Sequence, residues 1–115
     1  MFKTDIEEVW KILLTDEAVA LLQNGHFDGS EDDKRDGFIH LSTHAQLAGT
    51  IAKYFSGQGN LLALACPTGR LGDALRWEES RNGALFPHLY RQLRLTDVKV
   101  IIPTTPDWIA QLADA

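Results

Sequence analysis

The sequence is poor in cysteine and in positive charge, and each shortage excludes a class of protein. Cys66 is the single cysteine among 115 residues, so the chain has neither an intrachain disulfide framework nor a zinc site built on several cysteines. Its 11 Lys and Arg residues are outnumbered by 16 Asp and Glu residues, which gives a net charge of −5. Because surfaces that bind nucleic acids carry an excess of basic residues, this balance argues against a nucleic-acid partner.

Long hydrophobic runs and the common metal and phosphate motifs are also missing. No apolar run reaches the roughly 18–20 residues that cross a membrane, and the acidic residues Asp5, Glu7 and Glu8 do not fit a secretory signal. The chain has no CxxC or HExxH motif, no glycine-rich phosphate loop and no serine in a GxSxG turn. We therefore expect a cytoplasmic protein without a membrane partner and without a metal.

What the sequence does contain fits one domain spanning residues 1–115, since 44% of its residues are hydrophobic. Apolar periodicity and capping residues predict three helices, at residues 16–23, 44–55 and 106–112. Apolar and β-branched runs predict short strands at residues 38–42, 60–66, 75–78 and 98–102. The mixture predicts an α+β domain built on a small, bent β-sheet.

Three segments are harder to assign. Residues 5–14 place apolar side chains at helical spacing, but residues 9–14 also fit a buried strand, and the pattern alone slightly favours the helix. The polar, glycine-containing residues 26–37 are typical of an exposed loop, which is either an ordinary loop or a lid over a neighbouring site. Pro87 lacks a backbone N–H, so we expect residues 84–89 to form an edge or irregular segment, not a central strand.

A histidine interrupts the apolar stretch DGFIHLST at residues 36–43. On a strand, Phe38, His40 and Ser42 share one face. Two roles fit His40: a hydrogen-bonded core residue, or an imidazole that faces a ligand. Thr43 is placed to cap the next helix, and Ser42 and Thr43 together stand where the free N–H groups of a helix N-terminus attract anions such as phosphate.

Two later segments carry further candidate residues. Arg76 and Glu78 share one face of a predicted strand, which is either a charged surface hairpin or one wall of a cleft with Trp77 packed inward. The run FPHLY at residues 86–90 is either an irregular part of the core or a wall of aromatic stacking groups with one titratable nitrogen.

The strings GFIHLST, RWE and LFPHLY occur in this order at residues 37–43, 76–78 and 85–90. In this respect the chain resembles the domain-of-unknown-function family 952 of small bacterial proteins, over roughly residues 8–103. That family is grouped with ADP-ribosyltransferase-like proteins, so the resemblance implies a split, bent sheet whose cleft holds NAD. Family members often begin with a Tyr-His-Ile strand, which implies a strand at residues 9–14 and places Lys11 where a histidine is expected.

The resemblance also implies roles for individual residues. Glu78 is expected to be the catalytic carboxylate, because a negative charge near the ribose stabilises the positive charge that develops as the nicotinamide–ribose bond breaks. His40 is the second expected catalytic residue, and it orients ribose or phosphate. The expected ligand-binding residues are Lys11, Ser42, Thr43, Arg76, Trp77, Phe86, His88 and Tyr90.

Three functions remain open at this point. The first is an NAD- or nucleotide-binding, ADP-ribosyltransferase-like enzyme, and the second is a noncatalytic module that keeps the cleft for another small ligand. The third is an RNA 2′-phosphotransferase-like enzyme, which the charge of −5 argues against. Lys11 bears on the first, because a lysine binds a phosphate or a ribose hydroxyl but lacks the acceptor of a neutral imidazole.

Overall fold

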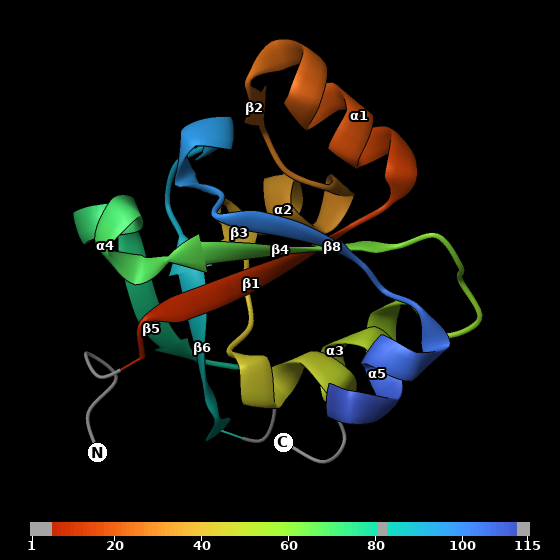
Figure 1. Ribbon diagram of the computed structural model, residues 1–115. Coiled ribbons are helices and arrows are strands. Elements are labelled where there is room, and N and C mark those ends of the chain that lie inside the picture. Colours follow the sequence, from red (N-terminus) through yellow and green to blue (C-terminus); the bar gives the residue numbers. More distant parts are fainter. Residues whose placement is uncertain (1–5, 81–82, 113–115) are drawn as a thin grey trace.

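Short strands and helices alternate along the chain in this computed structural model, which describes residues 6–80 and 83–112 (Figure 1). The strands are β1 (Glu8–Leu13), β2 (His26–Phe27), β3 (Ile39–His40), β4 (Leu62–Pro67), β5 (Leu75–Glu79), β6 (Leu85–Leu89), β7 (Leu93–Arg94) and β8 (Val100–Pro103). The α-helices are α1 (Thr15–Asn24), α2 (Glu31–Asp36), α3 (Leu47–Tyr54), α4 (Thr68–Leu71) and α5 (Pro106–Leu112). The three predicted helices are confirmed as α1, α3 and α5, and the two shorter helices come in addition.

The strands form small antiparallel sheets that meet at one backbone bridge. One sheet has the order β1-β4-β8, a second has the order β3-β6-β5, and β2 pairs with β7. Trp10 donates its N–H to the carbonyl of Ser42 at 2.7 Å, and Ser42 donates to the carbonyl of Trp10 at 2.9 Å. Ser42 lies two residues after the end of β3, so this bridge joins the two larger sheets, whose strands run at an angle to each other (Figure 1). The result is the α+β domain with a bent, split sheet that the sequence predicts.

The strand β1 is buried on both faces. Val9 and Leu13 pack into a core cluster that includes residues of α1, while Trp10 and Ile12 pack into a second cluster with residues of α3 and α5. A strand that contacts apolar residues on both sides loses the alternation of apolar and polar side chains. The helical spacing of residues 5–14 was therefore misleading, and the strand at residues 9–14 is confirmed within the described chain.

The cysteine lies inside β4. Cys66 is fully buried in the same cluster as Val9 and Leu13. Burial raises the pKa of its thiol to about 12, because a buried thiolate loses its hydration. Cys66 therefore packs as a small hydrophobic residue, as its apolar surroundings in the sequence indicate.

The polar stretch at residues 26–37 is not the loop that its composition predicts, since it contains β2 and α2. The Ser30 side chain accepts from the Asp33 N–H and the Asp33 carboxylate accepts from the Ser30 N–H, which forms a capping box at the start of α2. Gly37, in the left-handed region with φ at 86°, ends this helix. The six consecutive charged residues suggested a loop in the sequence. The capping residues on either side of them instead make the segment a helix.

The strand β6 is central, although the proline within it predicts an edge. Pro87 pairs with Trp77 of β5, and its carbonyl accepts from the N–H of Leu41 at 3.0 Å. The N and O atoms of one residue point to the same side of a strand, so the missing N–H of Pro87 faces β3. Leu41 lies opposite Pro87 in this register and donates to it, so the proline omits only the reciprocal bond of this one pair, and the β3–β6 ladder ends at His40.

The start of α3 follows the predicted cap. The Thr43 side chain accepts from the Gln46 N–H at 3.2 Å, and the Gln46 side chain accepts from the Thr43 N–H at 3.0 Å. This capping box opens a 3₁₀ turn (His44–Gln46) that continues into α3. In the part of the chain that the structure describes, no helix combines the length and the apolar character needed to cross a membrane.

Candidate functional site

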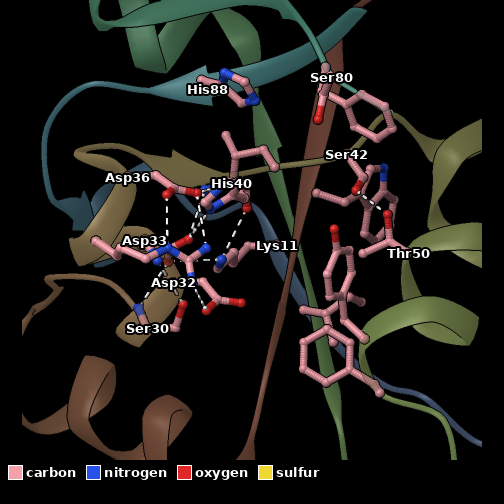
Figure 2. Close-up of a pocket in the computed structure, with 17 residues that line it drawn as sticks. Lys11, Ser30, Asp32, Asp33, Asp36, His40, Ser42, Thr50, Ser80 and His88 are labelled. Atoms are coloured by element: carbon pink, nitrogen blue, oxygen red, sulfur yellow. Dashed lines mark hydrogen bonds and ion pairs between the residues drawn. The ribbon is translucent and has the colours of Figure 1, made fainter. Parts of the chain in front are cut away.

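A cleft of about 240 Å³ opens beside the Trp10–Ser42 bridge, where the two larger sheets meet (Figure 2). Its wall combines residues of β1, α2, β3, α3 and β6. Figure 2 shows the charged side chains of α2 with Lys11 and His40 on one side, and Ser42 with Thr50 on the opposite side. Aromatic residues complete the wall, namely Trp10, Tyr54, Phe55 and Phe86.

A buried carboxylate organises the charged side. Asp33 of α2 is 2% exposed, and its oxygens accept from the Lys11 ammonium at 3.0 Å, the Ser30 N–H at 2.9 Å and the His40 N–H at 3.0 Å. A fourth contact joins it to Nδ1 of His40 at 2.6 Å. Burial alone raises the pKa of a carboxyl group, but these donors and the charge of Lys11 hold the pKa of Asp33 well below its ordinary value.

Lys11 reaches this carboxylate because it points to the α2 side of β1, on the same face as Val9 and Leu13. It is buried, and its Nζ donates to Asp33 and to the carbonyl of His40, each at 3.0 Å. The ammonium therefore joins β1, α2 and β3 at one point. This explains how a lysine is tolerated inside a central strand: its charge is neutralised by a carboxylate that is equally buried.

His40 lies between two carboxylates. Its Nδ1 is 2.6 Å from Asp33 Oδ1 and its Nε2 is 2.9 Å from Asp36 Oδ2. An imidazole donates from both nitrogens only in its protonated form, so this geometry suits a charged ring. The contact to Asp36 fastens the C-terminal end of α2 to β3, and Asp36 is also held by the guanidinium of Arg35 at 3.0 Å.

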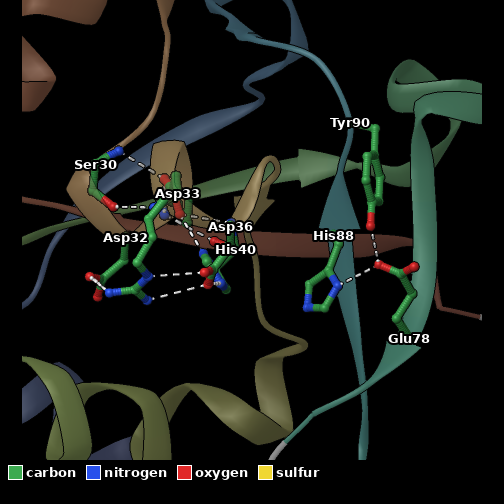
Figure 3. A network of polar contacts seen from close by, with 10 residues as sticks. Ser30, Asp32, Asp33, Asp36, His40, Glu78, His88 and Tyr90 are labelled. Atoms are coloured by element: carbon green, nitrogen blue, oxygen red, sulfur yellow. Dashed lines mark hydrogen bonds and ion pairs between the residues drawn. The ribbon is translucent and has the colours of Figure 1, made fainter.

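A second histidine–carboxylate pair stands on the neighbouring strands (Figure 3). Nδ1 of His88 is 2.8 Å from Oε1 of Glu78, and the hydroxyl of Tyr90 donates to the same oxygen at 2.7 Å. The hydrogen bond from Tyr90, followed by that from His88, lowers the pKa of Glu78, so the pair holds a carboxylate. Figure 3 shows Nδ1 of His88 turned toward Glu78 and the opposite edge of the ring turned toward Asp36 and His40.

Phe38 connects the two histidines. Its ring stacks on His88 with centroids 3.9 Å apart and lies 4.7 Å from the ring of His40. The two imidazoles are directly paired across β3 and β6, and their centroids are 5.7 Å apart. On the far side of this group, the Arg76 guanidinium lies over the ring of Tyr90 at 4.4 Å, a cation–π contact.

The structure gathers part of the predicted site. Lys11, His40, Ser42, Phe86 and His88 line the cleft. The other five lie elsewhere: Glu78 and Tyr90 stand behind His88, Arg76 covers Tyr90, Trp77 packs against the core and Thr43 caps the 3₁₀ turn. The expectation that Glu78 faces the cleft is therefore wrong in its detail, because the carboxylate is turned toward the back of the His88 ring.

The sequence interpretation missed Asp33, Asp36 and Phe38. Asp33 and Asp36 fall within a run of charged residues that suggested an exposed loop, yet both contact His40. The signal that could have identified Asp33 is its spacing from Ser30, since a capping residue three positions earlier marks a helix start. Phe38 was placed correctly on the face of His40, but its stacking on His88 depends on the register of two strands distant in sequence.

The chemistry of the cleft is that of histidines and carboxylates without a metal cage. Among the described side chains, no group of three His, Cys, Asp or Glu residues is arranged to hold a metal ion. His88 resembles a general base held by a carboxylate: Glu78 fixes its Nδ1 side, and the cleft meets the other side. On the opposite wall, Asp36 supplies a partly exposed carboxylate that is also bonded to His40.

Comparison with known proteins agrees with the sequence strings noted above. A family model described as "Protein of unknown function (DUF952)" matches residues 12–101, and the chain belongs to this family. The chain is similar to the crystal structure of protein CC0527 from Caulobacter crescentus, with 43% identity and a TM-score of 0.81 over 90% of this chain and 98% of that one. The solution NMR structure of the same protein is 45% identical, with a TM-score of 0.78 over 93% and 94% of the two chains. No curated protein matches.

Proposed function

We propose that the chain binds NAD or a related nucleotide in this cleft and acts as an ADP-ribosyltransferase-like enzyme. The observation that supports the proposal is the pairing of His88 with Glu78 on the wall that faces His40. A histidine fixed by a carboxylate on one nitrogen and open to a cleft on the other is a common arrangement for moving a proton at a ligand. The reaction class comes from the resemblance noted in the sequence, which implies an ADP-ribosyltransferase-like protein.

The proposed reaction transfers the ADP-ribosyl group of NAD from nicotinamide to an acceptor hydroxyl. The bond between ribose C1′ and the nicotinamide nitrogen breaks, and its electron pair leaves with nicotinamide. The acceptor oxygen, from water or another hydroxyl, forms the new bond to C1′, and Nε2 of His88 takes the proton of that hydroxyl. Because C1′ gains positive charge before the new bond forms, a nearby carboxylate lowers the barrier.

In this proposal the role of the carboxylate near the ribose, which the family resemblance implies for Glu78, belongs to Asp36. Glu78 holds His88 from behind and stabilises the ring when it takes a proton. Asp36, which lines the cleft and is partly exposed, is the carboxylate placed to face the ribose. The aromatic side chains of Trp10 and Phe86 offer the apolar surface on which a planar ring stacks.

A noncatalytic binding module is the second candidate, and the Lys11 network favours it. Lys11 stands where family members often have a histidine, and both Lys11 and Asp33 are engaged with partners inside the protein. These two charged residues of the wall therefore stabilise the fold. A binding module needs this stabilisation as much as an enzyme does. An RNA 2′-phosphotransferase-like activity is less well supported, because three aspartates line the cleft and disfavour a polyanion.

Isothermal titration calorimetry with NAD and ADP-ribose, together with chromatographic detection of released nicotinamide, tests the proposal. Binding of NAD with release of nicotinamide supports the enzyme, and release should stop in a His88→Gln variant that still folds. Binding without release in the presence of water and candidate protein acceptors supports the binding module. The absence of binding heat at millimolar NAD would overturn both the enzyme and NAD as the ligand.

A further inference from the structure

The cations that line the cleft are already neutralised by the protein. Lys11 is buried and contacts Asp33 at 3.0 Å, and two of its three N–H groups are used within the protein. The Arg35 guanidinium contacts Asp32 at 3.0 Å and Asp36 at 3.0 and 3.4 Å. A phosphate entering the cleft would have to compete with these carboxylates for both cations.

The carboxylates also set the sign of the local field. Among the residues that the structure describes, the cleft wall contains three aspartates but only Lys11 and Arg35 as permanent cations. Protonated His40 adds one positive charge, yet both of its nitrogens already face carboxylates. The whole chain has a net charge of −5, so no long-range attraction draws a polyanion toward this opening.

The volume of the cleft sets a second limit. Pockets that enclose drug-sized ligands have volumes of about 300–1,000 Å³, whereas this cleft has about 240 Å³. It therefore accommodates a fraction of a dinucleotide. The groups it presents are aromatic faces for a planar ring and, in His88, Asp36 and Ser42, side chains that bond neutral hydroxyls.

On the basis of the nucleotide-binding function proposed above, we propose that the cleft recognises the nucleoside part of its ligand, a planar base with its ribose, and leaves the phosphates in solvent. The aromatic wall takes the base. The ribose hydroxyls bond to Asp36 and to Nε2 of His88. The affinity then depends little on the charge of the phosphates, and a nucleoside without phosphates binds by itself.

Calorimetric titration of nicotinamide riboside, nicotinamide mononucleotide, NAD and inorganic pyrophosphate distinguishes this inference from the function on which it rests. We expect the riboside to bind within about threefold of NAD, a difference of less than about 0.7 kcal/mol. We also expect pyrophosphate not to compete with NAD, and added salt to weaken the binding of NAD no more than that of the riboside, whose pyridinium ring is itself a cation.

Each other outcome has a definite meaning. Binding of NAD without binding of the riboside, or displacement of NAD by pyrophosphate, overturns the nucleoside inference and leaves the proposed function intact. Binding of the riboside without nicotinamide release from NAD supports the inference and removes the enzymatic function. Failure of all four compounds to bind overturns both proposals.

An exposed arginine provides a sharper version of the test. Arg35 is 67% exposed, so Arg35→Gln should fold normally, and it should change the affinities for NAD and for the riboside by the same factor. If Arg35 instead binds phosphate, the variant would lose about tenfold for NAD and nothing for the riboside, which contradicts the inference. Lys34→Gln, an exposed cation of the same helix that does not line the cleft, is the matched control.

Discussion

His40 and His88 are paired across neighbouring strands and each is bonded to a carboxylate, yet they differ in how many partners they have. Both nitrogens of His40 face carboxylates, those of Asp33 and Asp36. His88 is bonded to Glu78 through Nδ1, and its other edge is turned toward the cleft. The difference separates a histidine whose two ring nitrogens both face carboxylates from one that is 5% exposed and lines the cleft with its ring.

The element that His40 holds is α2. Of the six residues of this helix, Asp33 is the buried one, so α2 is held by polar contacts and by few apolar ones. Short helices without an apolar face depend on such contacts for their position. The Asp33 side of the cleft is therefore expected to respond to substitution mainly in stability, and the His88 side mainly in activity.

The largest expected effect is that of Asp33→Asn. Without its charge the buried ammonium of Lys11 has a neutral partner, and breaking a buried ion pair in this way costs about 3–5 kcal/mol. Urea unfolding followed by circular dichroism measures the loss. Asp32→Asn, a neighbouring substitution at an exposed carboxylate, should leave the transition almost unchanged, and a similar loss in both variants would contradict a special role for Asp33.

The same substitution should change how stability depends on pH. The pKa of Asp33 is lower in the folded chain than in the unfolded one, so its contribution is present above the ordinary Asp pKa of about 3.9 and is lost as the pH falls below it. We expect the free energy of unfolding to fall progressively between roughly pH 5 and pH 1, the interval over which a carboxylate with a depressed pKa loses its contribution, and to fall less in Asp33→Asn. Equal slopes for the two proteins would contradict this prediction.

His88→Gln tests the other side of the comparison. If His88 is the general base, kcat for nicotinamide release should fall about 100- to 10,000-fold, the usual contribution of a positioned base, and NAD affinity should fall far less, because the glutamine amide still bonds a ribose hydroxyl. The matched control is His26→Gln, because His26 is also paired with a carboxylate, Asp28 at 3.0 Å, but is exposed and outside the cleft. Unchanged turnover in His88→Gln would remove the functional difference between the two histidines.

Glu78→Gln should have a smaller effect, a loss of about tenfold in kcat, since the amide oxygen still accepts from Nδ1 of His88 but the negative charge is gone. If Glu78 positions His88, the Glu78→Gln variant should show a second change that a loss of packing would not produce. The pH–rate profile should move toward lower pH, because the neutral amide no longer stabilises the protonated ring. Glu78→Asp should restore the profile in part, and an unmoved profile in Glu78→Gln would exclude this role.

The smallest expected effect on stability is that of Asp36→Asn. Asp36 is partly exposed and shares its contacts with Arg35 and His40, so solvent screens the interaction and the urea midpoint should move only slightly. Turnover should nevertheless fall if this carboxylate faces the ribose. A stability loss as large as that of Asp33→Asn would show that both contacts of His40 carry equal weight for the fold.

The strands and helices could be predicted from the sequence to the extent that local patterns decide them. The Thr43–Gln46 capping box and the apolar run of β4 are local features, and the structure contains both. The position of Pro87 in a central strand could not be predicted, because it depends on where the partner strand β3 ends. The strand β1 required the family resemblance, since burial on both faces removes the alternation that identifies a strand.

The candidate site was predictable for the histidines and not for their partners. His40 and His88 are unusual in apolar runs, which is a visible signal. Glu78 contacts His88 because Arg76 pairs with His88 across β5 and β6, which makes Glu78 its diagonal neighbour on the same face. Asp33 is buried because donors from three separate elements converge on it, and no property of its immediate sequence reports that convergence.

The buried thiol of Cys66 makes local opening of the folded chain measurable by chemical labelling. Thiol reagents attack the thiolate, and Cys66 is both inaccessible and held protonated by burial, with a pKa of about 12. A reagent in solution can therefore modify the chain only while β4 is separated from its neighbours. The rate at which a thiol reagent labels the unmodified protein therefore measures the free energy of that opening. Any ligand that stabilises the folded state will lower this labelling rate.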